Sequence, residues 1–319
     1  MTNPNNYSQW DFLFISAVAL FGITFKYSLN IPNKMSNTLN RIFYRGIIDN
    51  EDDAKTIISK LEAKANNWSN IAGFILGTLV FLGWMIGLDF NAWNIFLIIF
   101  ETYLAYVTGC IFGTMAAYGT LGYFFAKTGQ YKIALNLIPD CIDGASGLKP
   151  IGDFYFFQAI IASIPAFFIS IWWLIISLLS KLGYFIPVQT LEWKEKAILL
   201  LPLAVLFEVL VFILPMYKFH VIMSEFKTEL LNKSDRAIQQ ITDMKLQLLK
   251  IQKEEEFNLV ESKISELNER YRIYDRMNTW PVSLKTKELF AVNNLFLIMP
   301  VLFKHSGDIA KLIDTIKKM

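Results

Sequence analysis

One acidic residue inside an apolar stretch is the strongest chemical signal in this sequence. Glu208 lies in the apolar run 197–219, and at about 1.5 Å per residue it is about 16 Å along a helix, near the middle of a bilayer. An ionised carboxylate facing lipid there is costly, so we expect Glu208 to be protonated, paired or placed along a polar cavity. Pro202 and Pro215 flank it and predict a kinked helix. Glu208 is therefore predicted to serve an ion or proton pathway, or to make a structural hydrogen bond to another helix.

A second acid and a row of small residues share the apolar run 95–125. Glu101 lies a turn or two from the end of this run, where water still reaches it, and is a second pathway candidate. Small residues recur every four positions and lie near one helix face, where backbones can approach closely: Ala105, Gly109, Gly113 and Ala117. This face predicts packing within the chain, or an oligomer or pore seam. The run is longer than the ~20 residues that a span needs, which predicts a tilt, a break near Gly119 and Gly122, or a projection on the inner side.

A loop rich in glycine and proline, 139–153, is the third candidate. Its carboxylates Asp140, Asp143 and Asp153 are expected to cap helices or to gather a cation. The spacing matches neither a phosphate-binding P-loop nor an EF-hand. A rigid loop that positions the next span and a loop that senses a ligand or ion are the two interpretations.

The stretch PDCIDGASGLKPIG in this loop resembles the Pro-Asp-x-x-Gly-Gly-Leu type of loop of uncharacterised prokaryotic multi-span membrane proteins. The usual pair of glycines is stretched here to Gly144-Ala-Ser-Gly147. This resemblance implies a membrane protein and no particular activity.

Patterns typical of enzymes are missing from the sequence. The two histidines, His220 and His305, stand apart from carboxylates and cysteines, so neither a metal motif nor a nucleophile motif is formed. Cys110 and Cys141 do not suffice for a disulfide framework. We therefore predict no catalytic residue, no metal, no cofactor and no enzymatic activity.

The elements that must position these residues are five apolar stretches, at 12–29, 71–90, 95–125, 154–180 and 197–219. Hydrophobic residues make up 54% of the chain and charged residues 18%, below the ~25% usual in soluble domains. The predicted fold class is all-α, a polytopic membrane protein with about five transmembrane helices and a helical cytoplasmic layer that includes a long coiled-coil-like helix. The transmembrane domain is expected over 1–219 and the cytoplasmic helical region over 220–319.

The orientation follows from the distribution of basic residues, because short cytoplasmic loops are enriched in them. Segment 30–69 carries six lysines and arginines, which predicts that it is inside, together with the loop 127–153. The N-terminus and the connection 181–196 are then outside, and the region after Phe219 is cytoplasmic. The predicted location is the bacterial inner (plasma) membrane.

The region after Phe219 changes to a charged helical composition. Residues 220–275 lack Pro and Gly and would extend about 80 Å as one helix. Apolar positions of coiled-coil spacing form a seam: Phe257, Val260, Ile264, Leu267, Tyr271 and Tyr274. The step from Ile251 to Phe257 is out of phase, which predicts a register break or bend. The seam is expected to hold subunits together, or to belong to a stalk or hairpin that packs on the chain's own cytoplasmic loop.

The last apolar run, 289–303, is short and contains Asn293, Asn294 and Pro300. It predicts a re-entrant, interfacial or cytoplasmic core helix, with a sixth span as the alternative.

These patterns favour an oligomeric membrane channel or pore-forming protein whose cytoplasmic helices assemble and gate it. One alternative is a proton- or ion-coupled transporter that uses Glu208, and another is a non-transporting scaffold that recruits a cytoplasmic protein partner. The expected partners are the lipid bilayer and further copies of the chain. Nucleic acid is excluded, since the two charge signs are nearly balanced and no basic block occurs.

Overall fold

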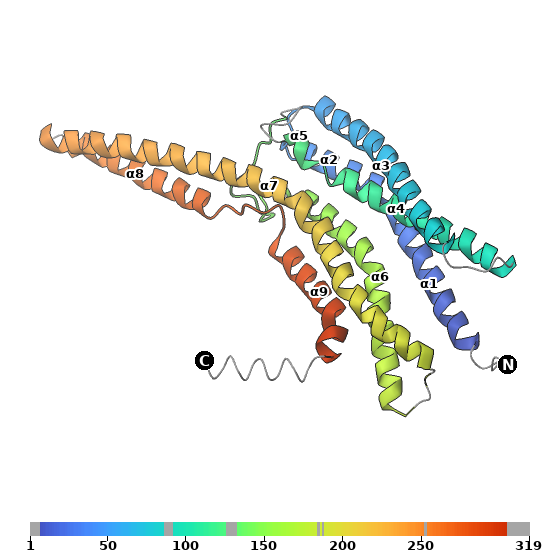
Figure 1. Ribbon diagram of the computed structural model, residues 1–319. Coiled ribbons are helices and arrows are strands. Elements are labelled where there is room, and N and C mark those ends of the chain that lie inside the picture. Colours follow the sequence, from blue (N-terminus) through green and yellow to red (C-terminus); the bar gives the residue numbers. More distant parts are fainter. Residues whose placement is uncertain are drawn as a thin grey trace.

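The computed structural model describes residues 7–85, 92–125, 133–183, 186, 188–251 and 254–304, and all of its regular elements there are helices (Figure 1). This confirms the all-α class. The helices are α1 (Tyr7–Ser28), α2 (Ile31–Tyr44), α3 (Glu51–Met85), α4 (Ala92–Tyr118), α5 (Gly122–Phe125), α6 (Lys149–Lys181), α7 (Val188–Ile251), α8 (Glu254–Asp275) and α9 (Leu284–Lys304).

Four segments of the described chain are long and apolar enough to cross a membrane: Glu51–Met85, Ile98–Phe125, Lys149–Lys181 and Ala204–Gln247. They overlap four of the five predicted spans, 71–90, 95–125, 154–180 and 197–219. Large apolar side chains on them point outward, among them Phe74, Leu79 and Ile99, which are 71%, 61% and 65% exposed. Such faces suit a lipid environment. The protein is therefore an integral membrane protein. The remaining predicted span, 12–29, falls mostly on α1, which is not among these four segments.

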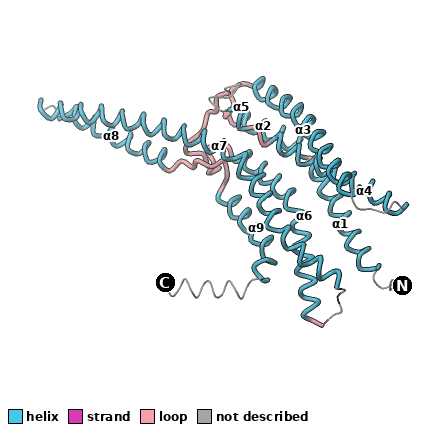
Figure 2. Tube along the Cα trace, viewed as in Figure 1, coloured by secondary structure: helices cyan, strands magenta, loops and turns pink. Residues whose placement is uncertain are grey.

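Helices α3 and α4 lie side by side along much of their length, as the views in Figures 1 and 2 show. Glycines allow this approach. A Cβ at Gly109 would lie 2.4 Å from the carbonyl oxygen of Ala72, and one at Gly113 would lie 2.3 Å from that of Trp68. The small-residue face of α4 is thus occupied by α3 of the same chain. This agrees with the predicted packing within the chain.

The two alanines of this small-residue row differ in burial. Ala117 is fully buried in the main apolar cluster, and Ala105 is half-buried. The helix ends at Tyr118 and resumes at Gly122, which confirms the predicted break near Gly119 and Gly122. A turn of residues 119–121 separates the two helices.

The described residues of 220–275, which are 220–251 and 254–275, belong to two helices and not to the single long helix that the composition suggested. α7 ends at Ile251, α8 begins at Glu254, and α8 runs back along α7 (Figure 1). Two ion pairs join the helices, Lys245–Glu261 at 2.9 Å and Lys227–Asp275 at 3.9 Å. The reversal coincides with the phase break after Ile251, where two apolar seams cannot stay on one helix face.

We call residues 220–251 of α7 together with α8 the stalk, which projects from the rest of the molecule (Figure 1). The predicted seam of α8 faces its own α7. Val260 is 8% exposed and the other five seam residues are half-buried, whereas the neighbouring Leu259 is 73% exposed. The hairpin interpretation of the seam therefore fits the structure.

The predicted inner segment 30–69 is largely helical. α2 buries one face, with Ile31, Met35, Leu39 and Ile42 in the main apolar cluster. The first turns of α3 bury Ile57 and Leu61 in the same cluster. Because α3 continues without a break to Met85, this layer is rigidly joined to the membrane-spanning part.

Candidate functional site

Glu208 is completely buried on α7, with Pro202 and Pro215 inside the same helix on either side of it. The side-chain amide of Asn293 donates a hydrogen bond of 2.7 Å to its Oε1, and that of Asn294 lies 3.5 Å from the same oxygen. Both asparagines belong to α9. We call these three residues the carboxylate–amide cluster.

Helix α9 reaches Glu208 because it lies along the apolar parts of α6 and α7. Ser170 of α6 donates a 2.9 Å hydrogen bond to the carbonyl oxygen of Leu297. The rings of Phe212 on α7 and Phe290 on α9 stack with centroids 4.2 Å apart. The run 289–303 therefore packs against two helices that contain candidate membrane spans. Its amides, which interrupt the apolar pattern, are the groups that meet the buried acid.

Two acceptor oxygens of the cluster are unsatisfied within the described part of the chain. Oε2 of Glu208 and Oδ1 of Asn294 are both buried and have no hydrogen-bond partner among the described residues. The Asn294 amide also donates to the carbonyl oxygen of Phe290, at 3.0 Å. A buried acceptor without a donor is unfavourable by about 1–3 kcal/mol. A proton on Glu208 would supply the missing donor, so the cluster is best satisfied with a neutral carboxyl group.

The second predicted pathway acid, Glu101, has a different partner. The indole Nε1 of Trp84 on α3 donates to its Oε2 at 2.8 Å. This contact ties α4 to α3, and Glu101 is half-buried. The two acids thus contact different residues and do not share a partner.

Sequence reasoning missed Gln158 on α6, a polar residue with 0% exposure. Neither its oxygen nor its nitrogen has a partner among the described residues. The signal that could have found it is a single amide within the apolar run 154–180.

The loop 139–153 is built around Asp143. Its carboxylate accepts hydrogen bonds from the backbone N–H groups of Ala145 at 2.9 Å and Gly147 at 3.1 Å, and it pairs with Arg45 at 2.7 Å. Burial by itself raises the pKa of Asp143, but these backbone hydrogen bonds outweigh it and hold the pKa below its usual value. Gly144 and Gly147 take the positive φ angles of 64° and 92° that this turn requires.

The three predicted loop carboxylates do not converge. Asp153 accepts a hydrogen bond from Thr286 at 3.3 Å, and Asp140 is exposed. No group of three or more His, Cys, Asp or Glu side chains suited to a metal occurs in the part of the chain that the structure describes. Asp143 itself already accepts two backbone hydrogen bonds and pairs with Arg45 within the folded structure.

This loop docks onto the linker 276–283 between α8 and α9; we call these two segments, 139–153 and 276–283, the junction. Asn278 donates to the carbonyl oxygen of Gly144 at 2.8 Å. A Cβ at Gly152 would lie 2.0 Å from the carbonyl oxygen of Pro281, so only glycine fits there. Figure 2 shows loops gathered at this point, where the stalk leaves the membrane-spanning helices.

His220 belongs to the junction as well. Its Nδ1 lies 2.9 Å from the carbonyl oxygen of Thr279, and its ring stacks on Trp280 with centroids 4.6 Å apart. This isolated histidine thus fixes the linker on α7. His305 lies outside the described residues.

Comparison of the chain with protein-family models, curated proteins and solved structures finds no match.

Proposed function

We propose that this protein passes protons or small cations across the membrane, and that the carboxylate–amide cluster is the central element of the pathway. The observation that carries the proposal is that Glu208 is fully buried and its described partners are neutral amides. An ionised carboxylate without a counter-charge is costly in a membrane interior. Glu208 is therefore expected to ionise only when water or a cation reaches it, which is the behaviour of a gate.

The gate in this proposal opens at the contact between α7 and α9. The Asn293 amide covers one oxygen of Glu208, so the described arrangement corresponds to a closed pathway. Displacement of α9 would remove this donor and expose the carboxylate. The linker 276–283 joins α9 directly to the stalk, so a partner or a second copy that moves the stalk is expected to act on the gate.

Our first candidate is a channel built from several copies, with the stalk as its cytoplasmic gating element. The seam of α8 and the glycine face of α4 are both used within the chain. Contacts between copies are therefore expected on other faces, such as the outward-facing apolar sides of α3 and α4. Light scattering of the purified protein in detergent measures the number of copies.

Our second candidate is a proton- or ion-coupled transporter, and one observation favours it. The carboxylate–amide cluster is completed by α7 and α9 of one chain, so its formation requires no second subunit. Single-channel currents in planar bilayers support the channel, whereas saturable flux with substrate exchange and no unitary currents supports the transporter.

The orientation proposed with this function has the stalk in the cytoplasm and the N-terminus outside. α9 begins at the junction and extends towards the opposite ends of α6 and α7, so we propose that it is embedded in the membrane as a further helix. We expect single cysteines at Lys55 and Lys149 to react with an impermeant maleimide from the stalk side and one at Glu192 from the other side. Reaction of all three from one side would refute this topology.

The decisive experiment is flux in reconstituted liposomes with Glu208→Gln. This change keeps the shape of the side chain and fixes it in the neutral state. We expect proton or cation flux to lose its pH dependence and to fall at least tenfold. Glu51→Gln is the matched control, because it makes the same chemical change at an exposed acid that pairs with Lys55, and it should retain wild-type flux.

Two outcomes would count against the proposal. If Glu208→Gln shows wild-type flux at every pH together with a lower melting temperature, Glu208 serves helix packing. If the wild-type protein shows no flux with any monovalent cation or with protons, with the stalk intact, the protein does not conduct.

A further inference from the structure

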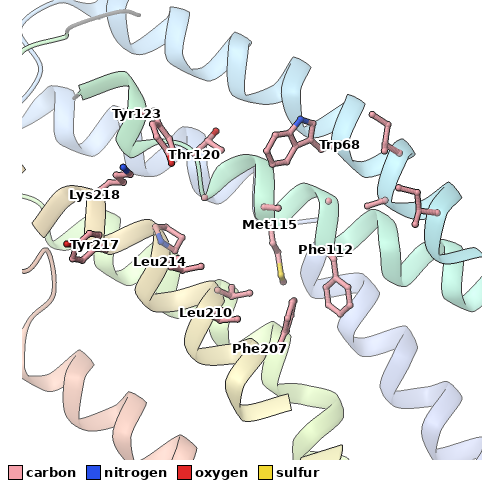
Figure 3. Close-up of a pocket in the computed structure, with 18 residues that line it drawn as sticks. Trp68, Phe112, Met115, Thr120, Tyr123, Phe207, Leu210, Leu214, Tyr217 and Lys218 are labelled. Atoms are coloured by element: carbon pink, nitrogen blue, oxygen red, sulfur yellow. The ribbon is translucent and has the colours of Figure 1, made fainter. Parts of the chain in front are cut away.

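An apolar groove of about 750 Å³ lies between α3, α4 and α7 (Figure 3). Phe112 and Phe207 line one end, and Leu210 and Leu214 of α7 line its length. Ile75 is 53% exposed and Leu214 is 60% exposed, so the groove is open along its side and not sealed in the core. Its walls suit a hydrocarbon chain.

The other end of the groove is basic and aromatic. Lys218 lies there with its Nζ 4.7 Å from the ring centroid of Tyr123. Lys64 reaches the same end, where its Nζ donates a 3.1 Å hydrogen bond to the Thr120 hydroxyl and lies 4.6 Å from the ring centroid of Trp68. Neither lysine makes an ion pair with a carboxylate of the described residues. Two positive charges therefore remain available for an anion.

The length and depth of the groove match one leaflet of a bilayer. From Phe207 to Lys218, which line its two ends, the groove follows eleven residues of α7, or about 16 Å. This is about half of the ~30 Å hydrocarbon core. Lysine and aromatic side chains are typical of the boundary between hydrocarbon and headgroups. The basic end thus lies at headgroup depth on the side of the membrane that carries the stalk.

We propose that this groove binds an anionic phospholipid of the leaflet on the stalk side. One acyl chain lies along Phe112, Leu210 and Leu214, and the phosphate lies between Lys64 and Lys218. Basic pockets between transmembrane helices are suited to anionic lipid headgroups in this way. A second copy of the chain is the less suitable occupant. The groove is apolar along its length and basic at one end, as an acyl chain with an anionic headgroup requires, whereas the packing of another helix needs no basic end. The site does not depend on the proposed conduction.

The test uses the full-length protein in detergent with palmitoyl-oleoyl phosphatidylglycerol as the probe and the corresponding phosphatidylcholine as the neutral lipid. Native mass spectrometry measures bound lipid and apparent affinity. We expect phosphatidylglycerol to bind more tightly, and its affinity to fall as salt rises. Lys64→Met with Lys218→Met should weaken it about twenty-five-fold, since each lysine near an anionic lipid contributes about fivefold.

Two further variants make the result specific. Lys233→Met is the matched control, because Lys233 lies farther along α7 in an exposed pair with Glu229, at 2.8 Å; it should bind phosphatidylglycerol like the wild type. Ala116→Phe fills the groove, which Ala116 lines, and leaves both lysines in place; it should abolish binding of the tightest lipid.

The proposal is wrong if the two lipids bind equally, or if the double variant and Ala116→Phe both retain wild-type affinity for phosphatidylglycerol. It is also wrong if Ala116→Phe changes the number of copies in light scattering without changing lipid binding, since the groove would then be a contact between subunits. Circular dichroism of each variant confirms that the helices are retained.

Discussion

Replacement of Asp143 by Asn tests whether this carboxylate holds the junction together. The side chain is only 7% exposed and accepts backbone hydrogen bonds from Ala145 and Gly147 while it pairs with Arg45. Asn can keep one acceptor oxygen, but it loses the charge and directs an N–H group towards other donors. Because charge-assisted hydrogen bonds are about twice as strong as neutral ones, we expect a loss of about 1–3 kcal/mol in the local free energy of opening.

Hydrogen exchange at the Ala145 and Gly147 amides measures this loss directly, since both donate to Asp143. With fast reclosing, a loss of 1–3 kcal/mol corresponds to exchange that is about fivefold to somewhat over a hundredfold faster. Asp140→Asn is the matched control, because Asp140 is exposed in the same loop. Equal exchange rates in the two variants would refute the assigned role of Asp143.

The stability that Asp143 gives to the loop is expected to fall at low pH. The hydrogen bonds lower the pKa of Asp143 below its ordinary value, so the folded loop favours the ionised form. Its contribution is complete above the unfolded pKa of about 3.9 and is lost as the pH falls through the lower, folded value. The difference in loop opening between wild type and Asp143→Asn should therefore be constant near neutral pH and shrink below about pH 4. A difference that grows in acid would contradict this assignment.

Two further predictions concern packing. Gly113→Ala should lower the melting temperature, because the new Cβ would lie 2.3 Å from a backbone oxygen of α3. At the control position Gly83 a new Cβ has nothing within 4 Å, so Gly83→Ala should be neutral or slightly stabilising. Equal melting temperatures of the two variants would contradict the close contact between α3 and α4. Leu267→Asp should separate α8 from α7, which would appear as faster hydrogen exchange in the stalk while the oligomer size stays the same. Leu259 is 73% exposed, so Leu259→Asp should change neither the exchange rate nor the oligomer size. If Leu267→Asp produced a smaller oligomer, the seam would instead be a contact between subunits.

The membrane class was predictable because long apolar runs have few alternatives in water. The sequence also indicated the acid that would be buried and the point where the stalk reverses, since both depend on local patterns. The position of α9 was not predictable. Asn293 and Asn294 read as interruptions of a short apolar run, and their partner Glu208 is 85 and 86 residues away.

The partner of the α8 seam was hidden for a related physical reason. A heptad pattern specifies an apolar stripe, but it does not say whether the helix that covers it belongs to the same chain. In the structure the covering helix is α7 of the same chain, and the ion pair between Lys245 and Glu261 joins the two helices. Sequence spacing alone does not show that these two residues face one another.

The junction gives the proposed gate a mechanical basis. The ring of Trp280 stacks on His220, and Gly152 leaves space only for the backbone at Pro281, so the linker cannot slide without a change at the base of the stalk. From Leu284 to Asn293 the helix α9 contains no Gly or Pro, and this stretch of about 14 Å is expected to move as a rigid rod. A rotation at the base of the stalk would therefore reach the amide that covers Glu208. This continuity makes α9, rather than the prolines of α7, the element that we expect to open the cluster.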